Sequence, residues 1–114
     1  MSTDNFLQIA CKDGFHRAIR VTPLEIPAET RMELPPGGVH GQLRGRKTMM
    51  LQNIGSGIVW IGDNSVEYGT GDEYTCSGIK VDPSGAFVLD SGRIRVYAYN
   101  PNPGPVHIKL LEAA

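Results

Sequence analysis

Two short apolar runs in the middle of the chain, residues 49–51 and 58–61, constrain its fold most. Each run is too short for a typical helix, and Gly55 and Gly57 lie between them. A glycine inside a helix costs about 1 kcal/mol relative to alanine, whereas glycines between two apolar runs favour a turn. The stretch therefore predicts a β-hairpin. The one tryptophan of the chain, Trp60, lies in the second run and is expected to anchor the core.

The composition indicates a β protein with a single domain. The chain has 114 residues, and its 14 glycines and 8 prolines recur between short apolar runs, as in β-sandwiches and barrels. A domain of this length can bury a core that folds without cross-links. We expect an all-β fold, a small antiparallel β-sandwich of jelly-roll-like form, with little helix.

The C-terminal half predicts four further strands, at residues 79–81, 86–89, 93–99 and 106–111. The first two flank Asp82-Pro83-Ser84-Gly85, which has proline and glycine at the positions that a type I turn prefers. The last two alternate apolar and polar residues, which predicts one face toward the core and one toward water. The apolar sets are Ile94, Val96 and Ala98 in one strand and Val106, Ile108 and Leu110 in the other.

Prolines interrupt the segment before the central runs, at positions 23, 27, 35 and 36. A proline lacks the N–H donor that a ladder needs, so this segment is not expected at the centre of a sheet. Residues 6–21 could form a hairpin around Asp13-Gly14, and residues 30–34 a strand. We predict a boundary after the Pro- and Gly-rich residues 35–41. It divides an extended Pro-rich N-terminal segment, residues 1–45, from a β-sandwich module, residues 46–114.

Charge and hydropathy exclude several functional classes. The net charge of −1 does not supply the basic excess that nucleic-acid binding needs, and no apolar run approaches a membrane span. The N-terminus has no secretion signal, so we expect synthesis in the cytoplasm, with Cys11 and Cys76 as free thiols. Basic residues concentrate before residue 48, and acidic ones between 48 and 92. This asymmetry reflects either ordinary solvated loops or complementary docking surfaces.

A search for catalytic motifs favours a protein that is not an enzyme and has no cofactor. His16, His40 and His107 are far apart, without the short spacing of a metal site. The chain also has neither a nucleophile elbow nor a phosphate loop. Tyr97 and Tyr99 share one face of a predicted strand beside Arg95, which fits either a small-ligand or sugar platform or packing against another subunit.

Several short motifs follow one another in a fixed order between residues 46 and 111. They are Arg46-Lys47-Thr48, Gln52-Asn53-Ile54-Gly55-Ser56, Ile61-Gly62, Gly78-Ile79-Lys80-Val81-Asp82-Pro83-Ser84-Gly85, Val96-Tyr97-Ala98 and the end of the chain from Val106 to Glu112. In this order the motifs resemble a small β-sandwich module of tailed-bacteriophage virion proteins. Such modules serve as capsid decoration (cement) proteins and in head fibres and tail structures.

The resemblance implies a structural virion protein that decorates the capsid exterior and stabilises contacts between capsomers. Its partners would be the major capsid protein and further copies of the chain in a homotrimer. Nucleic acid and membrane are not expected partners. The residues expected to make these contacts are Phe6, Leu7 and Ile9 in the extension, with Arg44, Arg46 and Lys47 opposite an acidic surface.

Two alternatives remain open at this stage. One is a tail, neck or head-fibre adaptor that joins two parts of a virion. The other is a carbohydrate-binding module or small β-barrel enzyme that uses Tyr97, Tyr99 and Trp60.

Overall fold

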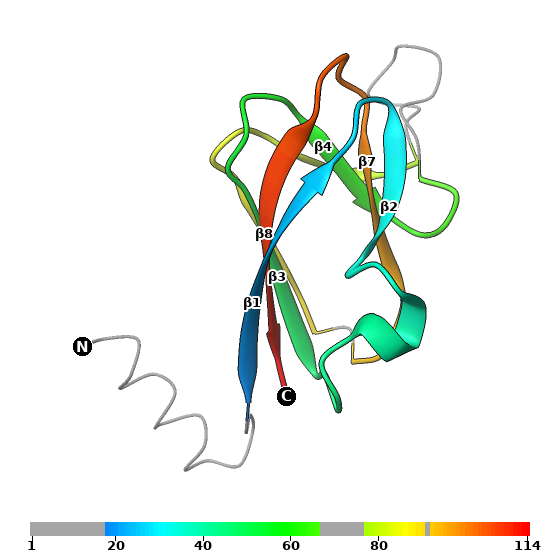
Figure 1. The fold of residues 1–114 in the computed structure, drawn as a ribbon, viewed down its shortest axis with the longest axis vertical. Helices are drawn as coiled ribbons and strands as arrows, with labels where there is room; N and C mark the ends of the chain where they lie inside the picture. The colour runs from blue at the N-terminus through cyan, green and yellow to red at the C-terminus, as the bar shows by residue number, and fades with distance from the viewer. Residues whose placement is uncertain (1–17, 67–76, 91) are drawn as a thin grey trace, which may run out of the picture.

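The computed structural model describes residues 18–66, 77–90 and 92–114. Within these ranges the chain forms eight strands and one short 3₁₀ helix (Figure 1). The elements are β1 (Ile19–Ile26), β2 (Thr30–Leu34), η1 (Gly38–Gly41), β3 (Thr48–Asn53), β4 (Val59–Gly62), β5 (Ile79–Val81), β6 (Ala86–Leu89), β7 (Val96–Asn100) and β8 (Val106–Ala113). No helix in this part of the chain is long and apolar enough to cross a membrane.

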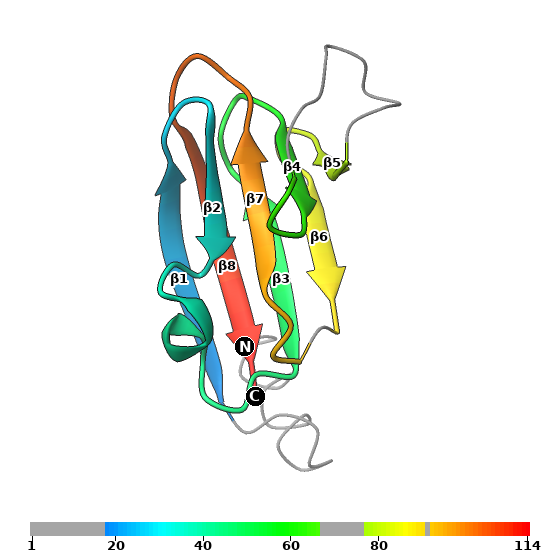
Figure 2. The ribbon, with the colours of Figure 1, turned by 90° about the vertical axis from the view of Figure 1, so that its right-hand side faces the viewer.

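The strands form two four-stranded antiparallel sheets that face each other. The first sheet has the order β1-β8-β3-β6 and the second has the order β2-β7-β4-β5. Figure 2 shows β1 and β2 along one side of the sandwich and β5 and β6 along the other. The predicted all-β sandwich is confirmed, because both sheets are antiparallel and the chain runs back and forth between them.

The core lies between the two sheets and follows the alternation of the strands. On β8, Val106, Ile108 and Leu110 are buried, while His107 and Lys109 are exposed, as predicted. The other sheet contributes buried residues that include Leu34, Val59, Ile61, Val81, Val96 and Ala98. Ile94 does not join them, although the alternation predicted that it would: it lies before the start of β7 and is 68% exposed.

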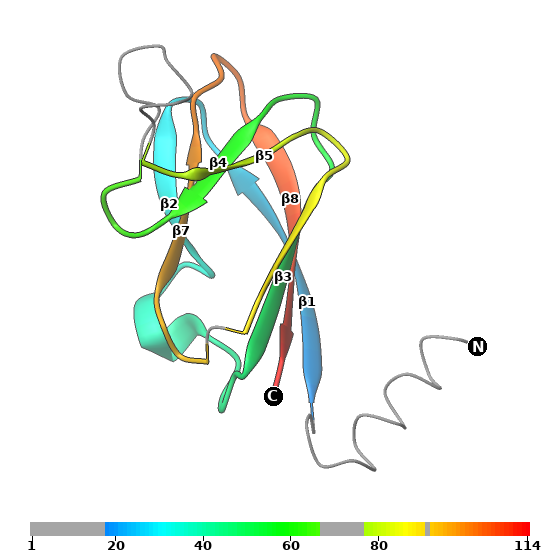
Figure 3. The same ribbon diagram turned by 180° about the vertical axis from the view of Figure 1, so that it is seen from behind.

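The predicted hairpin around Gly55 and Gly57 is wrong. β3 pairs with β8 and β6, whereas β4 pairs with β7 and β5, so the segment between β3 and β4 crosses from one sheet to the other (Figure 3). The buried side chain of Asn53 stabilises the segment that crosses between the sheets. Its amide donates to the carbonyls of Gly57 and Val81, at 2.7 and 3.1 Å. A buried polar side chain bonded in this way holds the corner between two layers.

The turn between β5 and β6 also joins the two sheets. The N–H of Gly85 donates to the carbonyl of Asp82 at 2.8 Å, which closes the predicted turn. Ser84 has a φ of 67°, however, whereas a type I turn requires a negative φ at that position. The turn is therefore present, but it is not of type I.

The predicted boundary at residue 45 is wrong for the part of the extension that the structure describes. β1 pairs with β8 over its whole length, and β2 pairs with β7, so residues 19–34 belong to both sheets. Thr30–Leu34 is a strand as predicted. The proline argument is also confirmed, because β1, which contains Pro23, and β2 are edge strands. Most of the predicted hairpin at 6–21 lies outside the described residues.

The alternation on β8 predicts that substitutions at two neighbouring positions will have very different effects on stability. Leu110→Ala is expected to lower the free energy of unfolding by about 2–5 kcal/mol, because it leaves a cavity in the core. Lys109→Ala removes an exposed side chain and is expected to change the free energy of unfolding by less than about 0.5 kcal/mol. Urea unfolding followed by tryptophan fluorescence measures both values. Equal effects would contradict the assigned faces of β8.

Candidate functional site

Between the strands the interior of the sandwich is largely apolar; the buried polar side chains of the described residues are Gln42, Arg46, Asn53, Asn100 and Glu112. The described strands fill it with aliphatic side chains, with Phe87 and Leu89 packed against the buried cluster. Within residues 18–66, 77–90 and 92–114, no group of three or more His, Cys, Asp or Glu residues could hold a metal ion. His40 and His107 are both exposed, on η1 and β8. A functional site of this part of the chain must therefore be sought on the outside.

Arg46 is buried, which contradicts its expected role as a capsid contact. Its guanidinium donates to the main-chain carbonyls of Leu34, Gly92 and Ile94, at 3.1, 3.0 and 2.8 Å, and to the carboxylate of Glu112 at 3.2 Å. Burial lowers the pKa of Arg46 because it disfavours the charged form, and the charge of Glu112 opposes this shift. The side chain is part of the scaffold.

The carboxylate of Glu112, which is fully buried, gathers three donors from different parts of the chain. Besides Arg46, Arg20 on β1 donates through Nε at 3.1 Å, and the N–H of Leu43 donates at 3.0 Å. Arg20 also donates to the carbonyl of Gly41 at 2.7 Å. These bonds attach the loop between η1 and β3 to β1 and β8. The sequence gives no signal for this cluster, because its members are far apart in the chain.

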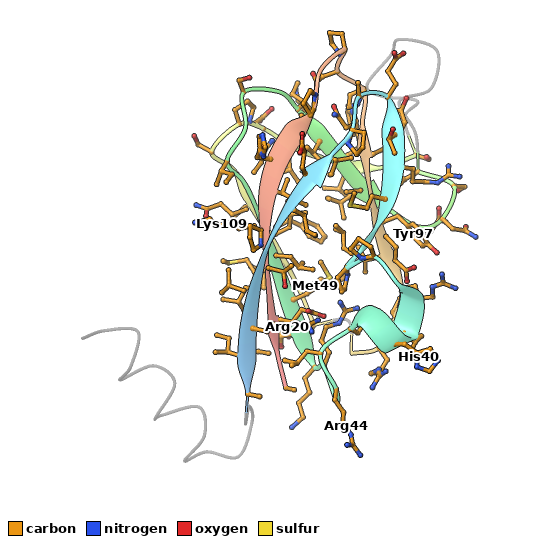
Figure 4. The ribbon with its side chains drawn as sticks, in the orientation of Figure 1. Arg20, His40, Arg44, Met49, Tyr97 and Lys109 are labelled. Carbon is orange, nitrogen blue, oxygen red and sulfur yellow. The ribbon has the colours of Figure 1, made fainter. Side chains whose placement is uncertain are left out.

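The attached loop displays two basic residues at one end of the sandwich. Arg44 and Lys47 are exposed, and the N–H of Lys47 donates to the carbonyl of Ala113 at 2.8 Å. Ala18 and Ala114 exchange hydrogen bonds of 2.7 and 2.8 Å at the same end. Figure 4 shows Arg44 at this end. The structure thus brings two of the predicted contact residues to the point where the described chain begins.

This end of the sandwich, the basic end, is defined by Arg44, Lys47 and Ala18. Phe6, Leu7 and Ile9 lie outside the described residues, but the segment that carries them joins the sandwich at Ala18. The basic end therefore combines two exposed cations with the attachment point of an apolar segment.

The predicted aromatic platform lies on the outer face of the second sheet. Trp60 pairs with Tyr99 in the β4–β7 register, and Gly62 pairs with Tyr97. Val59 and Ile61 face the core, so Trp60 points to the opposite side and is not the anchor of the core between the sheets. Its exposed fraction is only 4%, which leaves no surface on which a sugar ring could stack. The two tyrosines are partly exposed.

Charged residues complete this face. The guanidinium of Arg95 lies 5.8 Å from the ring centroid of Tyr97 and donates to both carboxylate oxygens of Glu33, at 2.7 and 2.9 Å. These hydrogen bonds lower the pKa of Glu33 and raise that of Arg95. The outer face of the second sheet therefore carries an ion pair beside Tyr97.

The outer face of the first sheet is different. Val21, Leu111, Met50 and Val88 lie opposite one another on successive strands and form one apolar row across the sheet. Their strand neighbours face the core, so the row points outward. Val21 is 55% exposed and Val88 is 61% exposed. Sequence reasoning missed this row, because each residue looks isolated until the strand register is known.

The comparisons with known proteins bear on the fold alone. No protein-family model matches the chain, and no curated protein matches it in sequence. Among solved structures, a de novo designed double-stranded β-helix is similar, with a TM-score of 0.52 and 12% identity over 82% of this chain and 97% of that one. The cupin domain of Schizosaccharomyces pombe Cnp3 has a TM-score of 0.53 and 13% identity over 85% of this chain and 53% of that one.

A sugar phosphate isomerase of the cupin superfamily from Silicibacter pomeroyi is also similar. Its TM-score is 0.53 and its identity 7%, over 93% of this chain and 56% of that one. The chain thus spans about half the length of the two natural proteins. The fold is of the cupin, jelly-roll type. At these identities the likeness assigns no activity, and the similar structures differ in kind, from a designed protein to a sugar phosphate isomerase.

The buried ion cluster predicts different outcomes for two arginines of one loop. Arg46→Met leaves Glu112 with fewer donors and three carbonyls without theirs, so we expect unfolding to become easier by about 3–5 kcal/mol. Arg44→Met changes an exposed side chain two positions away and is expected to cost less than about 0.5 kcal/mol. Denaturant-induced unfolding measures the free energy of unfolding of both variants. A stable Arg46→Met protein would show that the cluster does not hold the loop.

The pairing of Glu33 with Arg95 predicts a pH-dependent contribution to stability. The pKa of Glu33 is lowered in the folded state, so this contribution is complete above the unfolded pKa, about 4.3. It is lost as the pH falls through the lower folded value. Glu33→Gln should therefore destabilise the protein at pH 7, and this effect should shrink as the pH falls below the unfolded pKa. In an Arg95→Gln background the pH-dependent part should vanish, and its persistence there would contradict the assigned cause.

Proposed function

We propose that this protein is a structural virion protein, a bacteriophage capsid decoration (cement) protein that binds the capsid exterior and stabilises contacts between capsomers. The observation that carries the proposal is the basic end, where Arg44, Lys47 and the attachment point of residues 1–17 lie together. The ordered motifs between residues 46 and 111 supply the link to virion modules.

The basic end has the two properties that a docking site on an acidic protein surface needs. Apolar side chains supply buried anchors, and cations at the rim steer the approach and fix the orientation. The apolar anchors would be Phe6, Leu7 and Ile9, and the cations at the rim would be Arg44 and Lys47. Seventeen residues can span about 55–60 Å when fully extended, so the segment is long enough to contact a partner away from the sandwich itself.

The buried cluster gives Arg46 a positioning role in this proposal. Because Arg46 and Glu112 fix the loop on β8, Arg44 and Lys47 are held at one end of the sandwich before any partner binds. A preorganised contact loses less entropy on binding than a mobile one.

The packed interior supports a binding role without catalysis. In the described part of the chain, aliphatic side chains such as Leu51, Ile61 and Ile108 pack together between the two sheets. We therefore propose that the protein is not an enzyme and requires no cofactor.

A tail, neck or head-fibre adaptor remains the second candidate, because the same end could join two other virion parts. Decoration and adaptor roles differ in copy number. A decoration protein covers the shell, whereas an adaptor occurs at one vertex or on the tail.

Charge reversal at the basic end tests the proposed contact. Arg44→Glu combined with Lys47→Glu should weaken binding to undecorated capsids more than about tenfold, because like charges would then face each other across the interface. The control combines Arg31→Glu with Lys80→Glu, the same charge change on the second sheet, and should bind like the wild type. Co-sedimentation with purified capsids measures both.

Removal of residues 1–17 tests the apolar part of the same site. The truncated protein keeps all eight described strands, so its circular dichroism should retain the β-sheet signal, while capsid binding and the heat resistance of the particles should be lost. Unchanged binding by both the truncated and the charge-reversed proteins would refute the proposal.

A further inference from the structure

The apolar row on the outer face of the first sheet carries an inference beyond capsid binding. The row runs across all four strands through Val21, Leu111, Met50 and Val88. The next row toward the other end of the sheet is formed by Pro23, Lys109, Gln52 and Ala86, all exposed. A contiguous apolar row on a sheet face, with polar residues beside it, is typical of a surface that meets another protein.

We propose that a second copy of this chain covers this face and that the two copies pack sheet to sheet about a two-fold axis. The axis runs parallel to the strands, between β8 and β3. It places Val21 of one copy on Val88 of the other, and Leu111 on Met50. Two-fold contacts require such a self-complementary surface, and the row has a valine at each edge and a longer side chain at each inner position.

The neighbouring row, which runs from Pro23 to Ala86, also fits this two-fold axis. Lys109 lies on β8 and Gln52 lies opposite it on β3, so the two-fold places each lysine on the glutamine of the other copy. Like charges therefore do not meet at the centre of the contact, and the lysine ammonium can donate to the glutamine carbonyl. Figure 4 shows Lys109 on the outside of the first sheet, away from Met49 in the interior.

The outer face of the second sheet does not offer the same fit. It carries Arg31, Glu33 and Arg95, and its Arg95–Glu33 ion pair is satisfied within one chain. Burying such charges costs desolvation without a gain in apolar contact. Of the two sheet faces, the first is the one suited to a second copy.

The size of the face predicts a reversible contact. Strands about 4.8 Å apart, with a rise of about 3.3 Å per residue, give this sheet an area of about 400 Å². Two copies would bury about 800 Å², which is the range of weak, transient interfaces. The pair should therefore dissociate on dilution of the isolated protein. On a capsid, where copies are held close together, the same contact would be strengthened by local concentration.

Cysteine cross-linking tests the proposed register. In a background with Cys11→Ser and Cys76→Ser, Val21→Cys and Val88→Cys are introduced together. Within one chain these positions are about 14 Å apart across the sheet, whereas on two sheets packed face to face they are about 10 Å apart with their side chains pointing toward each other. A short bis-maleimide that reaches only the second pair of thiols should therefore give a covalent dimer on denaturing electrophoresis, whereas either variant alone should stay a monomer. Absence of the dimer, or equal cross-linking of a single variant, would overturn the proposal.

Sedimentation of the isolated protein without cysteine variants gives a second readout. The wild type should reach the mass of two chains as its concentration rises, and Val88→Glu should raise the dissociation constant at least about tenfold, because the valine loses its burial. The control is Ile79→Glu, at a 59% exposed position on β5, an edge strand of the other sheet. A wild-type monomer at all concentrations, or the homotrimer that the resemblance implies, would refute the two-fold pair. Neither result bears on capsid binding through the basic end.

Discussion

The ion cluster around the buried carboxylate of Glu112 is the interaction on which the basic end of this protein depends. The carboxylate lies on the last strand and accepts hydrogen bonds from Arg20, Arg46 and the main chain of Leu43. A buried charge is costly unless it is paired and hydrogen-bonded, and here its donors come from the first strand and from the loop before β3. The cluster therefore closes the sandwich at the end where the described chain begins and ends, and it fixes the loop that carries Arg44 and Lys47.

The outer faces of the two sheets differ in the residues that they expose. On the outer side of the second sheet Trp60 is only 4% exposed and Arg95 is paired with Glu33. The first sheet presents Val21, Leu111, Met50 and Val88 in one row. With the basic end, this arrangement would provide separate surfaces for the two partners that we propose, a foreign acidic protein and a second copy of the chain. A jelly-roll with a packed interior can serve as such a connector because its outer surfaces vary while the core stays constant.

Local sequence patterns predicted the parts of this fold that depend on local physics. The alternation of Val106, Ile108 and Leu110 identified the buried side of β8, and Pro23 correctly excluded its segment from the centre of a sheet. The remaining features of the fold depend on pairing between distant parts of the chain, which local patterns do not predict. Two apolar runs joined by glycines look the same whether the second strand pairs with the first or crosses to the facing sheet. Arg46 was expected on the surface because arginine is rarely buried, and its partner lies 66 residues further along the chain. The apolar row likewise appears only when the register of four strands is known.

A reconstruction of assembled capsids with and without the protein tests the central claim most directly. The account predicts additional density at repeated positions over the outside of the shell, with the end that carries Arg44 and Lys47 against the capsid surface. Density at a single vertex or on the tail would support the adaptor role instead. Density over the shell with that end pointing away from it, or no added density, would contradict the proposed docking site.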